Sequence, residues 1–263
     1  LRQRDPLRVL WVGWLERLVD DEMSVAEDRL TAGTVLWLLF CRSRMADSQY
    51  LLSEPWVQGS YMEGESSRTK TSNRAGSRLK KQVLVGPTLG VTGLSWCSKW
   101  LTLRKELGMA VADDQPLLPV RLADGRWSSA AVDGYELTLN LRHVLLRCGA
   151  APKELANVGS HSCKCTCLSW LAKAGVPAEK RKILGYHSNA ADKSVKCYSR
   201  DEFADPLRAL DDVITMIRDS KFFPDADRSG HFDVPAVVLL PLPAVHEADA
   251  ADAAIEHVDA AVY

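Results

Sequence analysis

The segments Gly159-Ser-His-Ser-Cys-Lys-Cys165, Leu184-Gly-Tyr-His187 and Cys197-Tyr-Ser-Arg200 follow one another in the second half of the chain. The first holds a His-x-x-Lys element, the second ends in a histidine 26 residues later, and the third places Tyr198 11 residues after that histidine. Histidine and lysine donate protons or hydrogen bonds to phosphate oxygens, and a tyrosine hydroxyl can attack phosphorus to give a phosphotyrosine. The order of these residue types indicates the C-terminal half of a phosphodiester-transfer site.

This arrangement resembles the catalytic domain of the tyrosine recombinases, the DNA strand-transfer family of the phage integrases. It is more closely similar to the recombinases of DIRS- and crypton-type eukaryotic mobile elements. The resemblance implies that Tyr198 is the nucleophile and that His161, Lys164 and His187 act on the scissile phosphate. Lys164 stands where the family has arginine, so the positive charge is kept but the bidentate fork of donors is lost. Tyr186 is a weaker rival to Tyr198, and each residue taken alone would more often be a packed or surface side chain.

The first half of the chain holds two further elements of the resemblance. Arg44 and Asp47 match the family's Arg-x-x-acid pattern at the end of a helix, where an arginine fork binds phosphate and the acid orients it. Arg42 is a competing candidate, and the spacing to Asp47 favours Arg44. Lys70 matches a hairpin lysine that the resemblance makes the general acid, although Lys80 and Lys81 lie close by in the sequence.

Periodicity and turn residues predict mainly helices with a small antiparallel sheet. A capping box at Ser24 predicts a helix to about Arg44, and strand-like runs at 61–68 and 82–85 predict a β-hairpin with a long tip. Segment 113–127 reads as a loop. Further helices are expected over 92–107, over 131–148, from His161 or Ser162 to Gly175, and from Pro177 to Gly185. Residues from about Phe223 onward are rich in Asp, Ala and Pro, and this composition favours disorder.

Charge is distributed unevenly along a chain whose formal net charge is −1. Segment 66–105 carries nine Lys and Arg residues and no acid, whereas segment 201–263 carries fourteen acids against four bases. The first segment is the candidate nucleic-acid surface, and an acidic tail is unsuited to binding a polyanion. The expected DNA contacts outside the catalytic set are Arg68, Arg74, Arg78, Lys80 and Lys81.

Seven cysteines, none in a CxxC pair, favour reduced thiols inside the cell. Cys163, Cys165 and Cys167 alternate along one helix, which favours small buried residues over a zinc site. No segment has the roughly 20 apolar residues of a membrane span, and no leader opens the chain, so a soluble protein is expected. The opening on Leu1 in the middle of an amphipathic run indicates a fragment of a longer protein.

Together these patterns predict an α+β recombinase-like catalytic core over residues 22–215, preceded by the end of a helical region over 1–21 and followed by an acidic tail over 216–263. The resemblance implies DNA cleavage and rejoining through a 3′-phosphotyrosyl intermediate without metal or other cofactor. The resemblance also implies a homotetramer on double-stranded DNA. Because the recombinases that the chain resembles are eukaryotic, a nuclear location is expected. The alternative is a decayed or domesticated DNA-binding protein that keeps the fold without the activity.

Overall fold

The computed structural model describes residues 4–66, 82–109, 115–187 and 202–232, of which about half are helical. The helices are α1 (Val9–Asp20), α2 (Ala26–Phe40), α3 (Met45–Ser48), α4 (Trp96–Glu106), α5 (Gly134–Arg147), α6 (Pro152–Leu155), α7 (Ser160–Lys173), α8 (Ala178–Leu184) and α10 (Ala204–Arg218). The strands are β1 (Trp56–Gln58), β2 (Tyr61–Ser66), β3 (Gln82–Pro87), β4 (Pro119–Arg121), β5 (Trp127–Ala131), β6 (Phe222–Phe223) and β7 (His231–Phe232). The predicted mixture of helices with small antiparallel sheets is confirmed.

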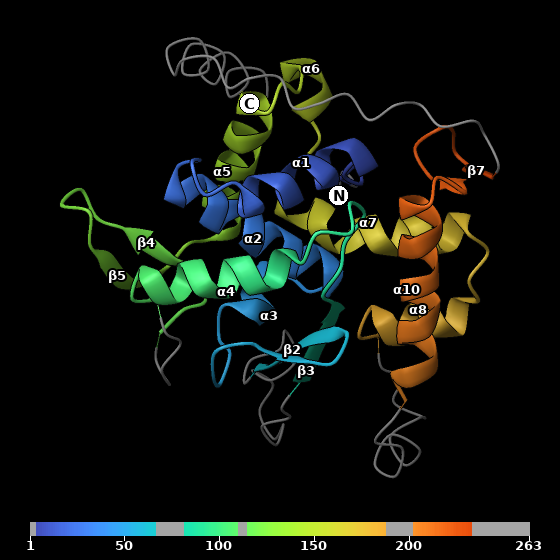
Figure 1. The fold of residues 1–263 in the computed structure, drawn as a ribbon, viewed down its shortest axis with the longest axis horizontal. Coiled ribbons are helices and arrows are strands. Elements are labelled where there is room, and N and C mark those ends of the chain that lie inside the picture. Colours follow the sequence, from blue (N-terminus) through green and yellow to red (C-terminus); the bar gives the residue numbers. More distant parts are fainter. Residues whose placement is uncertain (1–3, 67–81, 110–114, 188–201, 233–263) are drawn as a thin grey trace.

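Helix α2 is the centre of the fold, with α1, α4, α5 and α7 packed around it (Figure 1). Every residue from Arg29 to Phe40 is buried, as expected for a helix that is apolar on all sides. Gly33 permits a close approach of α4, since a Cβ atom there would lie 2.0 Å from Cδ1 of Trp100. The Trp100 ring in turn stacks on Trp37 with the ring centroids 6.2 Å apart. This aromatic contact fixes α4 against the middle of α2.

Helix α1 packs on α2 within the same hydrophobic core. The backbone N–H of Leu7 donates to Oγ1 of Thr166 at 2.8 Å, which joins the start of α1 to α7. The buried Glu16 carboxylate accepts from the backbone N–H groups of Val91 and Thr92, both at 2.8 Å. These bonds tie α1 to the loop before α4.

Strands β1, β2 and β3 form an antiparallel sheet in that order. Tyr61 pairs with Pro87 and Ser66 with Gln82, so the predicted β-hairpin is confirmed at both of its strands. A second antiparallel pair, β4 with β5, lies within and just beyond the segment that the sequence predicts as a loop. That loop prediction is wrong for β4, because Pro119 in a strand conceals the pattern.

The first predicted helix differs from α2 at both of its ends. Ser24 does not cap the helix; its hydroxyl donates instead to Oδ2 of Asp21 at 2.6 Å, and the N-cap residue is Val25. At the other end α2 stops at Phe40, because Arg42 has a φ of +50° and cannot continue a helix. The three residues before Arg44 therefore lie outside α2, and α3 begins directly after Arg44.

Residues 222–232 are ordered, so the predicted onset of disorder at Phe223 is wrong. Phe222 is fully buried and its ring stacks on Phe232 with the centroids 4.7 Å apart. Oδ2 of Asp225 accepts from the backbone N–H of Val9 at 2.5 Å. One of the acidic residues of this segment therefore makes a tertiary contact, which composition alone does not predict.

Six of the described helices end in a Schellman motif, in which one residue adopts a left-handed conformation and two backbone N–H groups donate to carbonyls of the last turn. Glycine holds this position after α4, α5 and α7, at Gly108, Gly149 and Gly175. Arg42, Tyr186 and Ser220 hold it after α2, α8 and α10, with φ values of 50°, 58° and 56°. Side chains with a Cβ are strained at positive φ, so the last three positions are conformationally costly.

Within the ranges that the structure describes, no helix is both long enough and apolar enough to cross a membrane.

Candidate functional site

Arg44 lies between α2 and α3, in extended conformation at the N-cap of α3. Its carbonyl accepts from the backbone N–H groups of Asp47 and Ser48, at 3.0 and 3.1 Å. Its guanidinium stays 38% exposed and lies 3.8 Å from the mostly buried carboxylate of Asp47. The predicted Arg-x-x-acid pair is therefore present, with an arginine that reaches solvent and an acid that is held in the fold.

Helix α7 supplies Lys164 from its second turn. The helix is anchored by Cys163 and Cys167, both fully buried, while Lys164 is only partly buried. Its ammonium donates to the carbonyl of Gly185 at 2.9 Å and lies 5.9 Å from the centre of the Tyr186 ring. Lys164 is thus held against the end of α8, 20 or so residues further along the chain.

His187 is positioned by the Schellman motif at the end of α8. The backbone N–H of Tyr186 donates to Ile183 and that of His187 donates to Lys182, both at 2.9 Å. Gly185 has a φ of −82° and the left-handed residue is Tyr186. The residue between glycine and histidine is therefore the one that turns the chain and carries His187 back toward α7.

The charges of Arg44, Lys164 and His187 act on one another. Burial and then the neighbouring Arg44 lower the pKa of Lys164 to about 8, while Asp47 opposes this shift. Burial, Lys164 and Arg44 lower the pKa of His187. Three groups from α3, α7 and the end of α8 therefore converge, and each of them favours a bound anion over another cation.

His161 lies on the exposed surface at the start of α7, one turn before Lys164. Among the residues that the structure describes, it has no hydrogen-bond or ion-pair partner. The structure therefore brings together three of the predicted phosphate ligands and leaves His161 at the edge of the group.

The other predicted residues lie outside the described ranges. These are the nucleophile Tyr198, the hairpin lysine Lys70, and the expected DNA contacts Arg68, Arg74, Arg78, Lys80 and Lys81. Strands β2 and β3, which flank the basic segment, are described up to the pair of Ser66 and Gln82.

The two rival residues, Arg42 and Tyr186, are fully and partly buried respectively. Arg42 has no exposed surface, so it cannot touch a ligand directly, and Arg44 is the arginine that can. Tyr186 is held by a hydrogen bond from the backbone N–H of Val85 at 3.3 Å, and burial raises the pKa of its hydroxyl to about 12. A hydroxyl that resists ionisation in this way is a poor nucleophile.

The basic segment 66–105 does not continue as a free cationic face into α4. Arg104 is fully buried and paired with Glu54, and the ammonium of Lys99 lies 2.7 Å from the carboxylate of Glu22. The prediction of a nucleic-acid surface is therefore wrong for Arg104. Its charge is used inside the fold.

The cysteines of α7 behave as small buried residues. Burial raises the pKa of Cys163 and Cys167 to about 12 and that of Cys165 to about 11. In the part of the chain covered by the structure, no group of three or more Cys, His, Asp or Glu side chains is arranged to hold a metal ion.

The contacts of Lys164 with the Tyr186 ring and the Gly185 carbonyl are not predictable from the residue pattern. The sequence carries little signal for this arrangement, because a tyrosine at positive φ has no characteristic pattern. The extra residue between Gly185 and His187 is the one visible trace of it.

Comparisons with models of known protein families, with curated proteins and with solved structures find no match for this chain.

Proposed function

We propose that the chain cleaves and rejoins DNA strands, with Arg44, Lys164 and His187 binding the scissile phosphate and Tyr198 attacking it. The observation that supports the proposal is the hydrogen bond from Lys164 to Gly185, two residues before His187, together with the charge of Arg44, which lowers the pKa of both Lys164 and His187. A phosphodiester in transfer develops negative charge on its nonbridging oxygens, and preorganised cationic donors stabilise it.

Each residue has a role that follows from its chemistry. Arg44 offers a planar fork to two phosphate oxygens, oriented by Asp47. Lys164 offers a single compact charge, and His187 offers a hydrogen bond from an imidazole whose lowered pKa keeps it neutral at neutral pH. The phosphotyrosyl bond would conserve the energy of the broken bond, so rejoining by a free 5′ hydroxyl would need no nucleotide.

The proposal is tested by trapping the covalent intermediate. The full chain is incubated with end-labelled duplexes of randomised sequence that carry a nick, so that cleavage releases a short fragment and leaves protein attached to DNA. We expect an adduct on a denaturing gel, resistant to EDTA, and absent for Tyr198→Phe. Tyr186→Phe is the matched control, because it removes the other candidate hydroxyl and should leave the adduct in place.

A second candidate function is DNA binding without cleavage. It is favoured by the bond from Lys164 to the Gly185 carbonyl, which engages the ammonium within the protein, and by the lysine in place of the expected arginine. Absence of any adduct, combined with duplex binding that weakens steeply with salt, would support this function and contradict strand transfer.

A further inference from the structure

Arg42 is a buried cation that has no acidic partner in the described part of the chain. Its side chain has no exposed surface, and among the described residues it forms no ion pair. Its Nη2 also lacks a hydrogen-bond partner there. An unpaired buried charge is costly, and here the cost comes on top of a left-handed backbone. Two unfavourable features at one residue suggest that the residue serves something other than stability.

The contacts that Arg42 does make join two helix ends. Its Nε donates to the carbonyl of Leu184, the last residue of α8, at 3.2 Å. Its Nη1 donates to the carbonyl of Phe40, the last residue of α2. Its guanidinium lies 5.9 Å from the centre of the Tyr186 ring. Both carbonyls belong to last turns, where acceptors lack partners in the helix itself.

The two helix ends joined in this way carry the candidate site. Arg44 follows Arg42 by two residues, and His187 follows Leu184 by three. Gly185, directly after Leu184, supplies the carbonyl that holds Lys164. The charge of Arg42 also reaches Lys164, because it contributes to the lowered pKa of that ammonium. A shift of the α8 end would therefore move His187 away from Arg44 and withdraw the Gly185 carbonyl that orients the Lys164 ammonium.

We propose that Arg42 is a positioning residue of the site, which holds the end of α8 against the end of α2 and so sets the spacing of Arg44, Lys164 and His187. This proposal rests on the proposed function for the identity of the ligand, a phosphate group. It does not require that DNA be cleaved. Misplacement of binding groups by a fraction of an ångström weakens a preorganised site strongly, so the effect of losing Arg42 is expected in binding more than in folding.

The test uses inorganic phosphate as the probe and three substitutions of Arg42 in the full chain. Arg42→Met removes the charge and the donors, Arg42→Lys keeps the charge, and Arg42→Gly removes the side chain but suits the left-handed backbone. We expect the dissociation constant for phosphate to rise about tenfold in the Met and Gly variants and to recover most of the way in the Lys variant.

A second readout follows the His187 imidazole by NMR as the pH is varied. In Arg42→Met the end of α8 is released, so the pKa of His187 should move up toward its ordinary value. Arg104→Met is the matched control, because Arg104 is equally buried but lies outside the site. It should lower the melting temperature and leave both the phosphate affinity and the His187 titration unchanged.

Folded Met and Gly variants with the parent's phosphate affinity and His187 titration would overturn the positioning role. If the Met variant does not fold, the Gly and Lys variants decide in the same way. Failure of the proposed function is recognised separately, since it appears as absence of the covalent adduct in the parent chain. Weakened phosphate binding without any adduct would leave Arg42 as a positioning residue of a binding site alone.

Discussion

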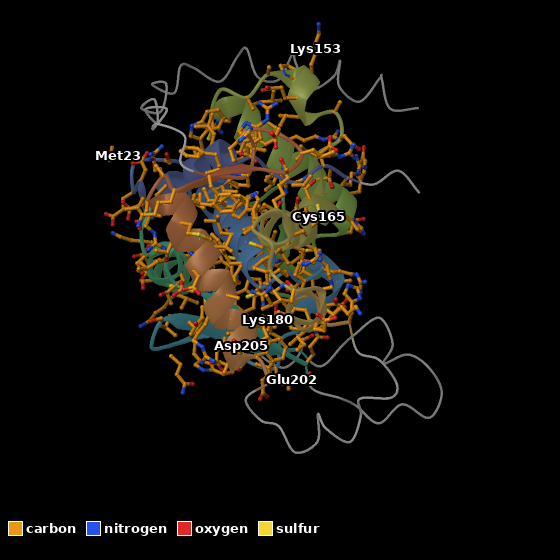
Figure 2. All side chains as sticks on the ribbon, turned by 90° about the vertical axis from the view of Figure 1, so that its right-hand side faces the viewer. Met23, Lys153, Cys165, Lys180, Glu202 and Asp205 are labelled. Atoms are coloured by element: carbon orange, nitrogen blue, oxygen red, sulfur yellow. The ribbon has the colours of Figure 1, made fainter. Side chains whose placement is uncertain are left out.

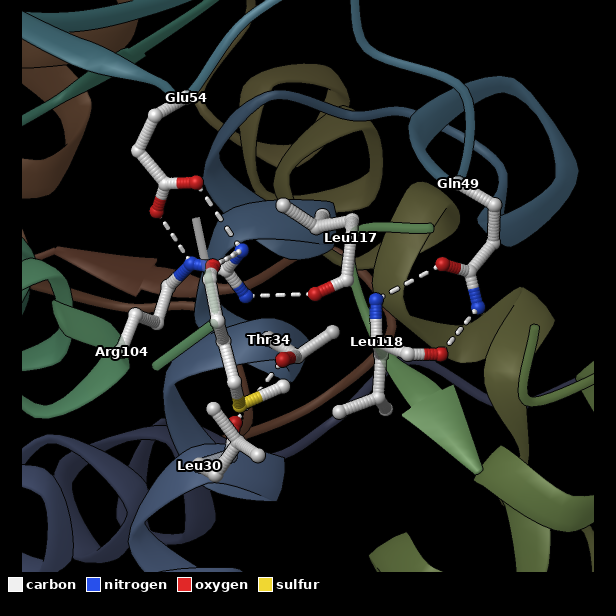
Figure 3. Close-up of polar contacts among 8 residues, drawn as sticks. Leu30, Thr34, Gln49, Glu54, Arg104, Leu117 and Leu118 are labelled. Atoms are coloured by element: carbon white, nitrogen blue, oxygen red, sulfur yellow. Dashed lines mark hydrogen bonds and ion pairs between the residues drawn. The ribbon is translucent and has the colours of Figure 1, made fainter. Parts of the chain in front are cut away.

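Arg42 and Arg104 are both completely buried arginines, yet their surroundings differ. Arg104 lies on α4 and meets both carboxylate oxygens of Glu54, while its remaining donors reach the carbonyls of Leu117 and Met109 at 2.5 and 2.9 Å (Figure 3). Arg42 reaches two carbonyls and has no carboxylate in the described structure.

The two arginines differ in whether the fold offsets the free-energy cost of burying their charge. At Arg104 the desolvated charge is neutralised and hydrogen-bonded, so the arginine contributes to the structure of the chain between α3 and β4. Gln49, which bonds to the backbone of Leu118 at 2.8 and 3.0 Å, completes this link (Figure 3). At Arg42 no carboxylate among the described residues pairs with the charge, and the guanidinium is held by backbone carbonyls alone. The first arrangement is expected of a structural arginine and the second of an anion site.

The largest effect on stability is expected for Arg104→Met. Arg104 is buried but Glu54 stays 32% exposed, so loss of their ion pair is partly offset by solvent. The carbonyls of Leu117 and Met109 also lose their donor, and the total expected cost is about 2–4 kcal/mol. Urea unfolding of the parent and the variant measures the difference. A loss below about 1 kcal/mol would show that the pair with Glu54 is not structural, and the comparison with Arg42 would fail.

Lys164 should make stability depend on pH at alkaline values. Its pKa is about 8 in the folded chain and 10.5 ordinarily, so between these values the unfolded chain binds more protons and stability rises with pH. Below pH 8 the full penalty remains, roughly 2 kcal/mol once solvent screening of this partly exposed group is allowed for.

Lys164→Met should remove this rise and stabilise the protein near neutral pH. Other lysines and tyrosines titrate in the same range, so the measured quantity is the difference between the two unfolding curves across pH 7–11. Parallel curves would show that the ammonium is not desolvated beside Arg44, and the convergence of charges would need another explanation.

Arg42→Met should cost less than Arg104→Met, about 1–2 kcal/mol. Two carbonyls lose their donor, but an uncompensated buried charge disappears at the same time. Arg42→Gly should be more stable than Arg42→Met if the strain relieved in the left-handed backbone exceeds the cost of the cavity that the lost side chain leaves. Equal losses for Arg42→Met and Arg104→Met in urea would contradict the distinction between the two arginines.

The smallest effect is expected at Ser220, the third side chain in a left-handed helix end. Ser220→Gly should stabilise the chain by about 0.5–1 kcal/mol, because relief of the left-handed conformation exceeds the cost of glycine's freedom in the unfolded chain. Phosphate affinity should not change, since Ser220 ends α10 and contributes nothing to the Arg44 site. A thermal melt detects the gain, and a decrease in stability would show that glycine's freedom in the unfolded chain outweighs the strain.

The helix ends explain how much of the fold the sequence predicts. Gly175 ends a helix in the sequence and in the structure, because glycine signals the left-handed position directly. The end of α2 is predicted four residues too late, since Arg42 occupies a position at which sequence patterns expect glycine. The β4 and β5 pair is hidden by Pro119, and the order of segment 222–232 depends on contacts with α1 and α7 that lie far away in sequence.

Only part of the candidate site is predictable from the sequence. The resemblance to tyrosine recombinases implies Arg44, Lys164 and His187, and in the structure the charge of Arg44 acts on the other two. The ion pair between Lys180 and Asp205, 2.8 Å apart, helps to hold α8 against α10 near this region (Figure 2). Three-dimensional packing, which residue spacing does not encode, determines the burial of Arg42, the turn at Tyr186 and the ion pair between Arg104 and Glu54.

The alkylation rates of the two buried cysteines of α7 can report how often the core opens. Cys163 and Cys167 lie inside α7 with thiols that burial keeps protonated, so an alkylating reagent can modify them only after the helix separates from its neighbours. Cys165, on the same helix, is partly exposed and should be modified first. The ratio of these labelling rates, read peptide by peptide, would report how often α7 leaves α2, and whether a phosphate held by Lys164 slows that departure.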